Sequence, residues 1–136
     1  MKHRHVILIV DDDTDDREII RDAFMSKHDE NCEFIFIENG DKLLEYLQTE
    51  SNGKLPSVIM LDLNMPGKDG REVLKDIKTN DTYRTIPIVV FTTSSSLRDK
   101  QTSYHLGANC FVTKPDTFNK LVELTDSIAR LWLPAL

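Results

Sequence analysis

Five short apolar runs alternate along the chain with segments in which apolar residues recur every three or four positions. The runs lie at Val6–Val10, Phe34–Ile37, Val58–Leu61, Ile88–Phe91 and Cys110–Val112. Each is rich in β-branched or aromatic residues and is bounded by Asp, Gly, Pro or Ser, as is typical of strands covered on both faces. Strands that alternate with helices imply parallel pairing and right-handed crossovers. The sequence therefore predicts an α/β fold, a doubly wound (βα)5 parallel sheet.

The intervening segments predict helices with identifiable caps. Asp13 or Thr14 can cap the first helix, and Gly107 can stop the fourth, which follows Ser94–Ser96. The residues at helical spacing are Ile19, Ile20, Ala23, Phe24 and Lys27; Leu43, Leu44 and Leu47; Val73, Leu74 and Ile77; and Phe118, Leu121, Val122, Thr125, Ile128, Ala129 and Trp132. Because these elements use the entire chain, we expect a single domain of residues 1–136 with a core at about 5–133.

The charge balance narrows the range of partners. The chain has 23 acidic and 17 basic residues, a formal net charge of −6. This argues against a general nucleic-acid surface, which needs clustered Lys and Arg. No apolar stretch approaches the ~20 residues of a membrane helix, and no signal-peptide run is visible at the N-terminus. We therefore expect a cytoplasmic protein that binds neither nucleic acid nor membrane.

Polar side chains follow four of the predicted strands. Asp11, Asp12 and Asp13 follow the first strand, Asp62 the third, Thr92, Thr93 and Ser94 the fourth, and Thr113 and Lys114 the fifth. These groups should converge, because the carboxyl ends of parallel strands form the site in an open sheet. Clustered carboxylates need a cation, and Mg²⁺ binds one or two carboxylates while leaving positions for a phosphate. A lysine and a threonine beside it suit phosphoryl oxygens, which predicts phosphoryl transfer to a carboxylate.

Each of these groups taken alone has a simpler explanation. The Asp11–Asp13 run and Thr92 could cap helices, Asp62 could be a turn residue, and Lys114 could be an ordinary surface lysine. Their joint placement at successive strand ends is much harder to attribute to chance. Together they favour a functional site.

The motifs resemble those of receiver domains of two-component response regulators, in order and over nearly the whole chain. They are Ile9-Val10-Asp11-Asp12, Leu61-Asp62-Leu63-Asn64-Met65-Pro66 with Asp69-Gly70, Val90-Phe91-Thr92, Gly107-Ala108 and Lys114-Pro115. The resemblance implies the flavodoxin-like strand order 2-1-3-4-5. In that order Cys32 and Cys110 lie at opposite sheet edges, about 19 Å apart at ~4.8 Å per strand. A disulfide needs Cα atoms within ~7 Å, so both should be free thiols.

The resemblance also implies a role for each site residue. Asp62 would be the phosphoacceptor and a metal ligand, Asp12 would bind Mg²⁺ directly, Asp11 would bind it through a water, and the backbone carbonyl of Asn64 would complete the protein ligands. Lys114 would pair with phosphoryl oxygens, Thr92 and Phe111 would form the switch, and Asn64, Thr93 and Ser94 would tune phosphoryl lifetime. The Lys114–Pro115 bond would be cis, although the sequence alone favours trans.

The implied partners are a sensor histidine kinase or a phosphotransfer protein. The chain would catalyse at most its own phosphorylation and dephosphorylation. The chain is also similar to small single-domain regulators associated with bacterial phytochromes, which are often dimers. The similarity lies in the stretch from Ile77–Asp81 through Ile86-Pro87, in Thr92–Ser94 and in the ending Leu131–Pro134. A homodimer would use the fourth helix, fifth strand and fifth helix. Leu124, Leu131 and the tail Leu133–Leu136 could form its seam, or could fold back onto the sheet.

Other interpretations fit less well. A degenerate receiver that binds a partner without phosphate is the main rival, although every named site residue is present. A haloacid-dehalogenase-type phosphatase fits Asp11-x-Asp13, but its motif needs Thr or Val where this chain has Asp15. A calcium loop needs Gly at its sixth position, where this chain has Asp16. A nucleotide site needs a Gly-rich turn after the first strand, and this sequence has none there.

Overall fold

The computed structural model describes residues 5–28, 32–49 and 54–133. Strands and helices alternate in the order β1 (His5–Val10), α1 (Thr14–Met25), β2 (Cys32–Ile37), α2 (Gly40–Thr49), β3 (Val58–Leu61), α3 (Gly70–Lys78), β4 (Ile88–Thr92), α4 (Leu97–His105), β5 (Cys110–Thr113) and α5 (Phe118–Trp132). In the described part of the chain, the strands form one parallel sheet in the order β2-β1-β3-β4-β5. The predicted fold and strand order are confirmed.

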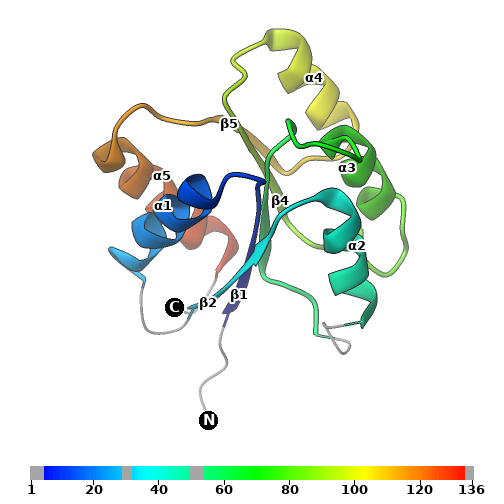
Figure 1. Cartoon of the computed structure of the whole chain (residues 1–136), viewed down its shortest axis with the longest axis horizontal. Coiled ribbons are helices and arrows are strands. Elements are labelled where there is room, and N and C mark those ends of the chain that lie inside the picture. Colours follow the sequence, from blue (N-terminus) through cyan, green and yellow to red (C-terminus); the bar gives the residue numbers. More distant parts are fainter. Residues whose placement is uncertain (1–4, 29–31, 50–53, 134–136) are drawn as a thin grey trace.

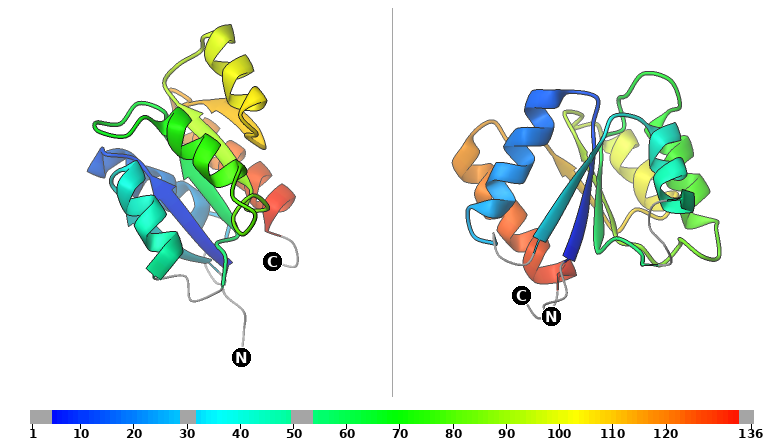
Figure 2. Two further views of the ribbon diagram at one scale, coloured as in Figure 1. Left: turned by 90° about the vertical axis from the view of Figure 1, so that its right-hand side faces the viewer. Right: turned by 60° about the horizontal axis from the view of Figure 1, so that its bottom comes forward.

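The sheet lies between two helical layers. Figure 1 shows α1 and α5 on one face of the sheet and α2, α3 and α4 on the other, and the turned views of Figure 2 show the same layers. Successive side chains of a strand point to opposite faces, so Ile7 and Ile9 pack towards α1 and α5 while Leu8 and Val10 pack towards α2 and α3. Every residue of β3 and β4 is buried, which explains their continuously apolar character.

The helix boundaries follow the predicted caps. The Asp13 carboxylate accepts hydrogen bonds from the backbone N–H groups of Asp15 and Asp16 at the start of α1. Ser96 caps α4 through the N–H of Asp99. Gly107 follows α4 with a φ of 104°, a left-handed conformation that favours glycine. In these places local sequence decides where a helix begins or ends.

Two residues expected on apolar helix faces are exposed instead. Ile19 on α1 is 45% exposed and Phe118 on α5 is 47% exposed. Ile19 lies one position off the buried stripe of Ile20 and Phe24, and Phe118 begins its helix one turn before buried Leu121. Both side chains line a hollow of about 260 Å³ beside the carboxyl edge of the sheet. Helical spacing places both residues on a helix face but does not show where the sheet beneath that face ends.

Several further expectations concern the end of the chain. The Lys114–Pro115 bond is trans, since the described residues contain no cis peptide bond; the expected cis bond is corrected to the isomer that X–Pro bonds intrinsically favour. Leu124 packs against the core and Leu133 is buried, whereas Leu131 is 69% exposed. The rest of the tail, residues 134–136, lies outside the described residues.

Cys32 and Cys110 are free thiols on opposite edge strands, as predicted.

Candidate functional site

The sheet's backbone ladder extends one residue past the strands and fixes the site residues. The N–H of Asp62 donates to the carbonyl of Val10 over 3.0 Å, and the N–H of Lys114 donates to the carbonyl of Thr92 over 2.7 Å. The N–H of Asp11 likewise donates to the carbonyl of Ile37 over 3.0 Å. Because these backbone positions are held by hydrogen bonds between neighbouring strands, the side chains that follow the strands meet at one edge.

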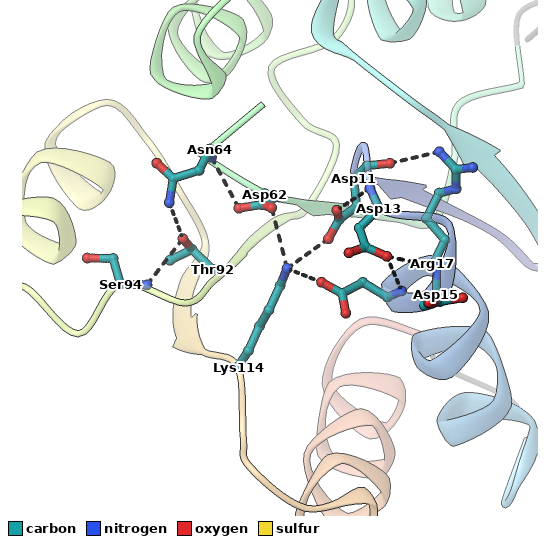
Figure 3. A network of polar contacts seen from close by, with 10 residues as sticks. Asp11, Asp13, Asp15, Arg17, Asp62, Asn64, Thr92, Ser94 and Lys114 are labelled. Carbon is teal, nitrogen blue, oxygen red and sulfur yellow. Dashed lines mark hydrogen bonds and ion pairs between the residues drawn. The ribbon is translucent and has the colours of Figure 1, made fainter. Parts of the chain in front are cut away.

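Lys114 lies at the centre of the charged half of this site. Its Nζ is 2.8 Å from Asp11 Oδ2, 2.9 Å from Asp16 Oδ2 and 3.4 Å from Asp62 Oδ2. In Figure 3 the Lys114 side chain rises between Asp62 and Asp11, and dashed lines join its nitrogen to both. The three loops after β1, β3 and β5 are thus tied together by one ammonium group.

Burial decides the electrostatics of this group of residues. Asp11 is 2% exposed and Asp62 is 6% exposed. Burial raises the pKa of the Asp11 carboxyl above its usual value, although its hydrogen bond from Lys114 opposes the shift. Burial acts against the Lys114 charge too, but hydrogen bonds to Asp11 and Asp16 outweigh it and raise the pKa of Lys114. The site therefore holds a charged Lys114 beside the buried Asp11 carboxylate, and the lysine offsets part of the cost of burying that carboxylate's charge.

The carboxylates are arranged as a divalent cation would need them. Asp11, Asp12 and Asp62 each offer an oxygen, and these oxygens lie within 4.8 Å of one another. Asp12 is exposed while the other two are buried, so the cluster opens to solvent on one side. Hard oxygen ligands with an open side suit a small divalent ion that keeps some of its waters. The residues present fit such an ion.

Neutral groups make up the other half of the site. Thr92 is fully buried, and its Oγ1 accepts from Asn64 Nδ2 at 3.3 Å and from the N–H of Ser94 at 3.4 Å. The N–H of Asn64 donates to Asp62 Oδ1 at 3.1 Å. Figure 3 shows this chain of contacts running from Asp62 through Asn64 to Thr92 and Ser94. Asn64 is therefore the residue that joins the two halves.

Two of the predicted residues lie apart from this network. Thr93 is exposed directly after β4. Phe111 is half-buried on β5 and packs against the core on the α2/α3 face, while its N–H donates to the hydroxyl of Tyr104 on α4 over 3.1 Å. Their assigned roles, like the Asn64 carbonyl's role as a metal ligand, stay predictions.

Sequence reasoning missed two features of the site. Asp16 contacts Lys114 directly, although the sequence singled it out only as an obstacle to a calcium loop. Arg71 on α3 donates to Asp99 on α4 at 2.7 Å, and Ser94 Oγ donates to the same carboxylate at 2.6 Å. Helical direction could have indicated Asp16, since side chains in the first turn lean back towards the helix start. The Arg71–Asp99 contact links two helices and had no local signal.

A shallow hollow adjoins the charged half. It is lined by α1 residues Asp16, Ile19 and Ile20 and by the segment after β5, from Lys114 to Phe118. Its apolar residues Ile19, Ile20 and Phe118 therefore lie beside Asp16 and Lys114 of the charged half.

Among the described residues, no helix is both long and apolar enough to pass through a bilayer.

Sequence comparison gives a family directly: residues 7–126 match the response regulator receiver domain. Response regulator Rcp1 from Synechocystis sp. is 37% identical over 131 residues, which cover 94% of this chain and 88% of that protein.

Solved structures agree with that comparison. The Mn²⁺-bound form of Rcp1 is 36% identical, with a TM-score of 0.83 over 97% of this chain and 96% of that one. The phosphorylated cyanobacterial phytochrome response regulator RcpA is 34% identical, with a TM-score of 0.87 over 98% and 96%. The predicted likeness to phytochrome-associated regulators is confirmed. This chain belongs to the response regulator receiver domain family and carries the receiver of a two-component response regulator.

Proposed function

We propose that Asp62 accepts a phosphoryl group from a phosphohistidine of a sensor kinase or phosphotransfer protein, and that the acceptance is Mg²⁺-dependent. The chain would act as a single receiver domain in the cytoplasm. The observation that carries the proposal is the position of Asp62, within reach of Lys114 and in one oxygen cluster with Asp11 and Asp12.

The covalent step involves few atoms. An Asp62 carboxylate oxygen attacks the phosphorus, the P–N bond to the donor imidazole breaks, and the imidazole takes up a proton. The product is an acyl phosphate on Asp62 and a neutral histidine. The Asp62 backbone is held by the hydrogen bond from its N–H to the Val10 carbonyl. The Asp62 side chain is held because Oδ1 accepts a hydrogen bond from the N–H of Asn64. The nucleophile is held in position before the donor arrives.

Neighbouring groups would balance the negative charge of Asp62 and of the phosphoryl oxygens. Asp11, Asp12 and Asp62 would hold Mg²⁺, and the Asn64 carbonyl is assigned to the same role. When bound, the ion supplies positive charge that lowers the repulsion between these carboxylates and the incoming phosphoryl oxygens. Lys114 stays protonated beside Asp62 and offers N–H donors to the same oxygens. Thr92 lies across the site and would donate its hydroxyl once the phosphoryl group is present.

The direct test is Asp62→Asn, which keeps the side-chain shape and removes the nucleophile. We expect the full-length variant to show no acid-labile phosphorylation with acetyl phosphate and Mg²⁺ or with a histidine kinase. Asp116→Asn is the matched control, because Asp116 is an exposed acid on the same edge whose side chain pairs with Lys120. The control should label like wild type. Labelling of Asp62→Asn at the wild-type level would show that the acceptor is wrong.

A wild-type chain that does not label would instead support the degenerate-receiver hypothesis. A beryllofluoride titration with Mg²⁺, followed by amide NMR, separates that case from a slow donor reaction. Shifts at Thr92, Ser94 and Phe111 are expected for a working receiver. Omitting Mg²⁺ should remove the response, which tests the metal requirement without any phosphoryl donor.

The exposed apolar residues of α4 and α5 support a proposed homodimer. Leu97 and Tyr104 on α4 are 67% and 44% exposed, and Leu131 on α5 is 69% exposed. Asp126 faces the end of α1, since its carboxylate accepts from His28, three residues after that helix ends. Leu131 follows five positions later, about 140° around the helix at ~100° per residue, and so points away from α1. Leu131 lies on the side of α5 that we expect to form the dimer surface together with α4 and β5.

Sedimentation of the full chain with and without beryllofluoride and Mg²⁺ tests this surface. We expect the phosphoryl mimic to shift wild type towards dimer and Leu131→Asp to remain monomeric. Ile19→Asp is the control, because Ile19 is also an exposed apolar residue but lies on α1, beside the hollow at the start of α5. A dimer that persists in Leu131→Asp would place the seam elsewhere.

A further inference from the structure

Lys114 has three hydrogen-bond donors and three carboxylate partners. A lysine ammonium carries three N–H groups and no acceptor. The partners are Asp11 at 2.8 Å, Asp16 at 2.9 Å and Asp62 at 3.4 Å. Each belongs to a different local environment, so the three contacts are not equivalent.

Two of these partners have other tasks in the proposed reaction, and Asp16 has none. Asp62 becomes the acyl phosphate, and Asp11 belongs to the oxygen cluster suited to the metal ion. Asp16 is outside that cluster and is not an acceptor. When the other two carboxylates are engaged, Asp16 is therefore the carboxylate left to hold Lys114.

The fold places Asp16 firmly enough for this task. It lies in the first turn of α1, where its N–H donates to the Asp13 cap at 3.2 Å. Ile20, one turn later on the same side of the helix, is buried at 4% exposure. Helix α1 is fixed against the sheet and α5 by Ile20, Ala23 and Phe24. The carboxylate of Asp16 is thus carried by a rigid element and points towards the site.

We propose that Asp16 is a positioning residue for phosphorylation: it anchors the Lys114 ammonium so that its remaining N–H groups face the phosphoryl oxygens on Asp62. This inference rests on the proposed function and adds a residue to it. A lysine has a flexible four-carbon stem, and one fixed partner limits the directions that its donors can take. Lys114 is already confined, with its side chain 14% exposed.

Asp16 could also slow phosphorylation by electrostatic repulsion, and this second effect predicts the opposite change in the labelling rate. A carboxylate close to the site repels an incoming phosphoryl anion and competes for Lys114. If that repulsion dominated, removing Asp16 would speed labelling. Anchoring predicts slower labelling, so the direction of the change separates the two effects.

The experiment compares Asp16→Ala, Asp16→Asn and Asp15→Ala in the full chain. Asp15→Ala is the matched control, since Asp15 is an acid in the same first turn and the Asp13 cap uses its backbone N–H rather than its side chain. With saturating acetyl phosphate and Mg²⁺, Asp16→Ala should lower the maximal labelling rate by about tenfold, at the lower end of the effect of losing an orienting contact at a metal site. Asp16→Asn keeps an acceptor oxygen and should stay close to wild type, as should Asp15→Ala.

A second measurement needs neither metal nor phosphoryl donor. The ¹H–¹⁵N signal of the Lys114 ammonium should be protected from solvent exchange in wild type, Asp15→Ala and Asp16→Asn, and should lose that protection in Asp16→Ala. An unchanged ammonium signal in Asp16→Ala, or labelling as fast as wild type or faster, overturns the inference. If wild type itself does not label, the proposed function fails while the ammonium measurement still decides whether Asp16 anchors Lys114.

Discussion

The charged and neutral halves of the site are held together very differently. In the charged half, Lys114 makes ion pairs of 2.8 and 2.9 Å to Asp11 and Asp16. In the neutral half, the Thr92 hydroxyl has contacts of 3.3 and 3.4 Å. Charge-assisted hydrogen bonds of normal length are about twice as strong as neutral ones, and the Thr92 contacts are long even for neutral groups.

The helices beside each half show the same difference. Helix α1, next to the charged half, buries Ile20, Ala23 and Phe24. Helix α4, which follows the neutral half, buries Ser103 alone among Leu97–His105, and the Ser103 hydroxyl has no hydrogen-bond partner. The groups that receive charge are thus fixed in advance. The Thr92 hydroxyl has only long contacts, and α4 has few apolar contacts and is tied through Asp99 to Ser94 and Arg71, so this side can move at lower cost.

The largest expected change in stability comes from Lys114→Met, which leaves buried Asp11 and Asp62 without their cation. We expect the free energy of unfolding at neutral pH to fall by about 2–3 kcal/mol, less than for a fully buried pair because Lys114 keeps some exposure. Urea unfolding measures it, with Lys120→Met, an exposed lysine, as the control. Added Mg²⁺ should recover part of the loss. A variant as stable as wild type would mean that the charged half is not held by Lys114.

Ser103→Ala should act in the opposite direction on α4. It removes a buried hydroxyl without a partner and introduces a better helix former, so we expect stability to rise by about 1 kcal/mol. Ser127→Ala is the control, because the exposed Ser127 hydroxyl has a partner in the Glu123 carbonyl. Urea unfolding again gives the difference. A loss of stability in Ser103→Ala would show that α4 is better anchored than its burial indicates.

Thr92→Val separates stability from response. The change keeps the volume and removes the hydroxyl, whose two contacts are long, so stability should change by less than about 1 kcal/mol. Acid-labile labelling should persist, while the amide shifts that beryllofluoride causes on α4 and β5 should be lost. The measurement is the same NMR titration as for wild type. Full retention of those shifts would remove Thr92 from the switch.

The smallest effect concerns pH and the Asp99 carboxylate. Hydrogen bonds from Ser94 and Arg71 lower the pKa of Asp99 below its usual value. A lowered folded-state pKa stabilises the fold fully above the unfolded value of about 3.9, and this contribution disappears as pH falls through the folded value. The stability difference between wild type and Asp99→Asn should therefore be constant near neutral pH, shrink below about pH 4, and stay under about 1 kcal/mol because the pair is partly exposed.

Unfolding measured between pH 3 and pH 7 would test this, with Asp81→Asn as an exposed control. A difference that grows on acidification would contradict the sign of the shift. Together with Thr92→Val, the result would tell whether α4 is held mainly by Asp99 or by the hydroxyl network.

The success of the sequence predictions depended on how local the cause was. Asp62 and Lys114 were found because each directly follows a buried strand, and parallel pairing brings such positions to one edge. Asp13, Ser96 and Gly107 were found because caps depend on neighbouring backbone groups. The exposure of Ile19 and Phe118 could not be predicted from helical spacing, because burial of a helix face depends on the extent of the sheet beneath it.

The sequence by itself determined the strands, their alternation with helices and the residue types delivered to the carboxyl edge, since these follow from local periodicity and chain order. Tertiary structure alone decided which carboxylates share Lys114, how Arg71 meets Asp99, and which side chains surround the hollow. Those contacts join residues far apart in the chain, and their distances depend on how the helices pack on the sheet. No local pattern records that packing.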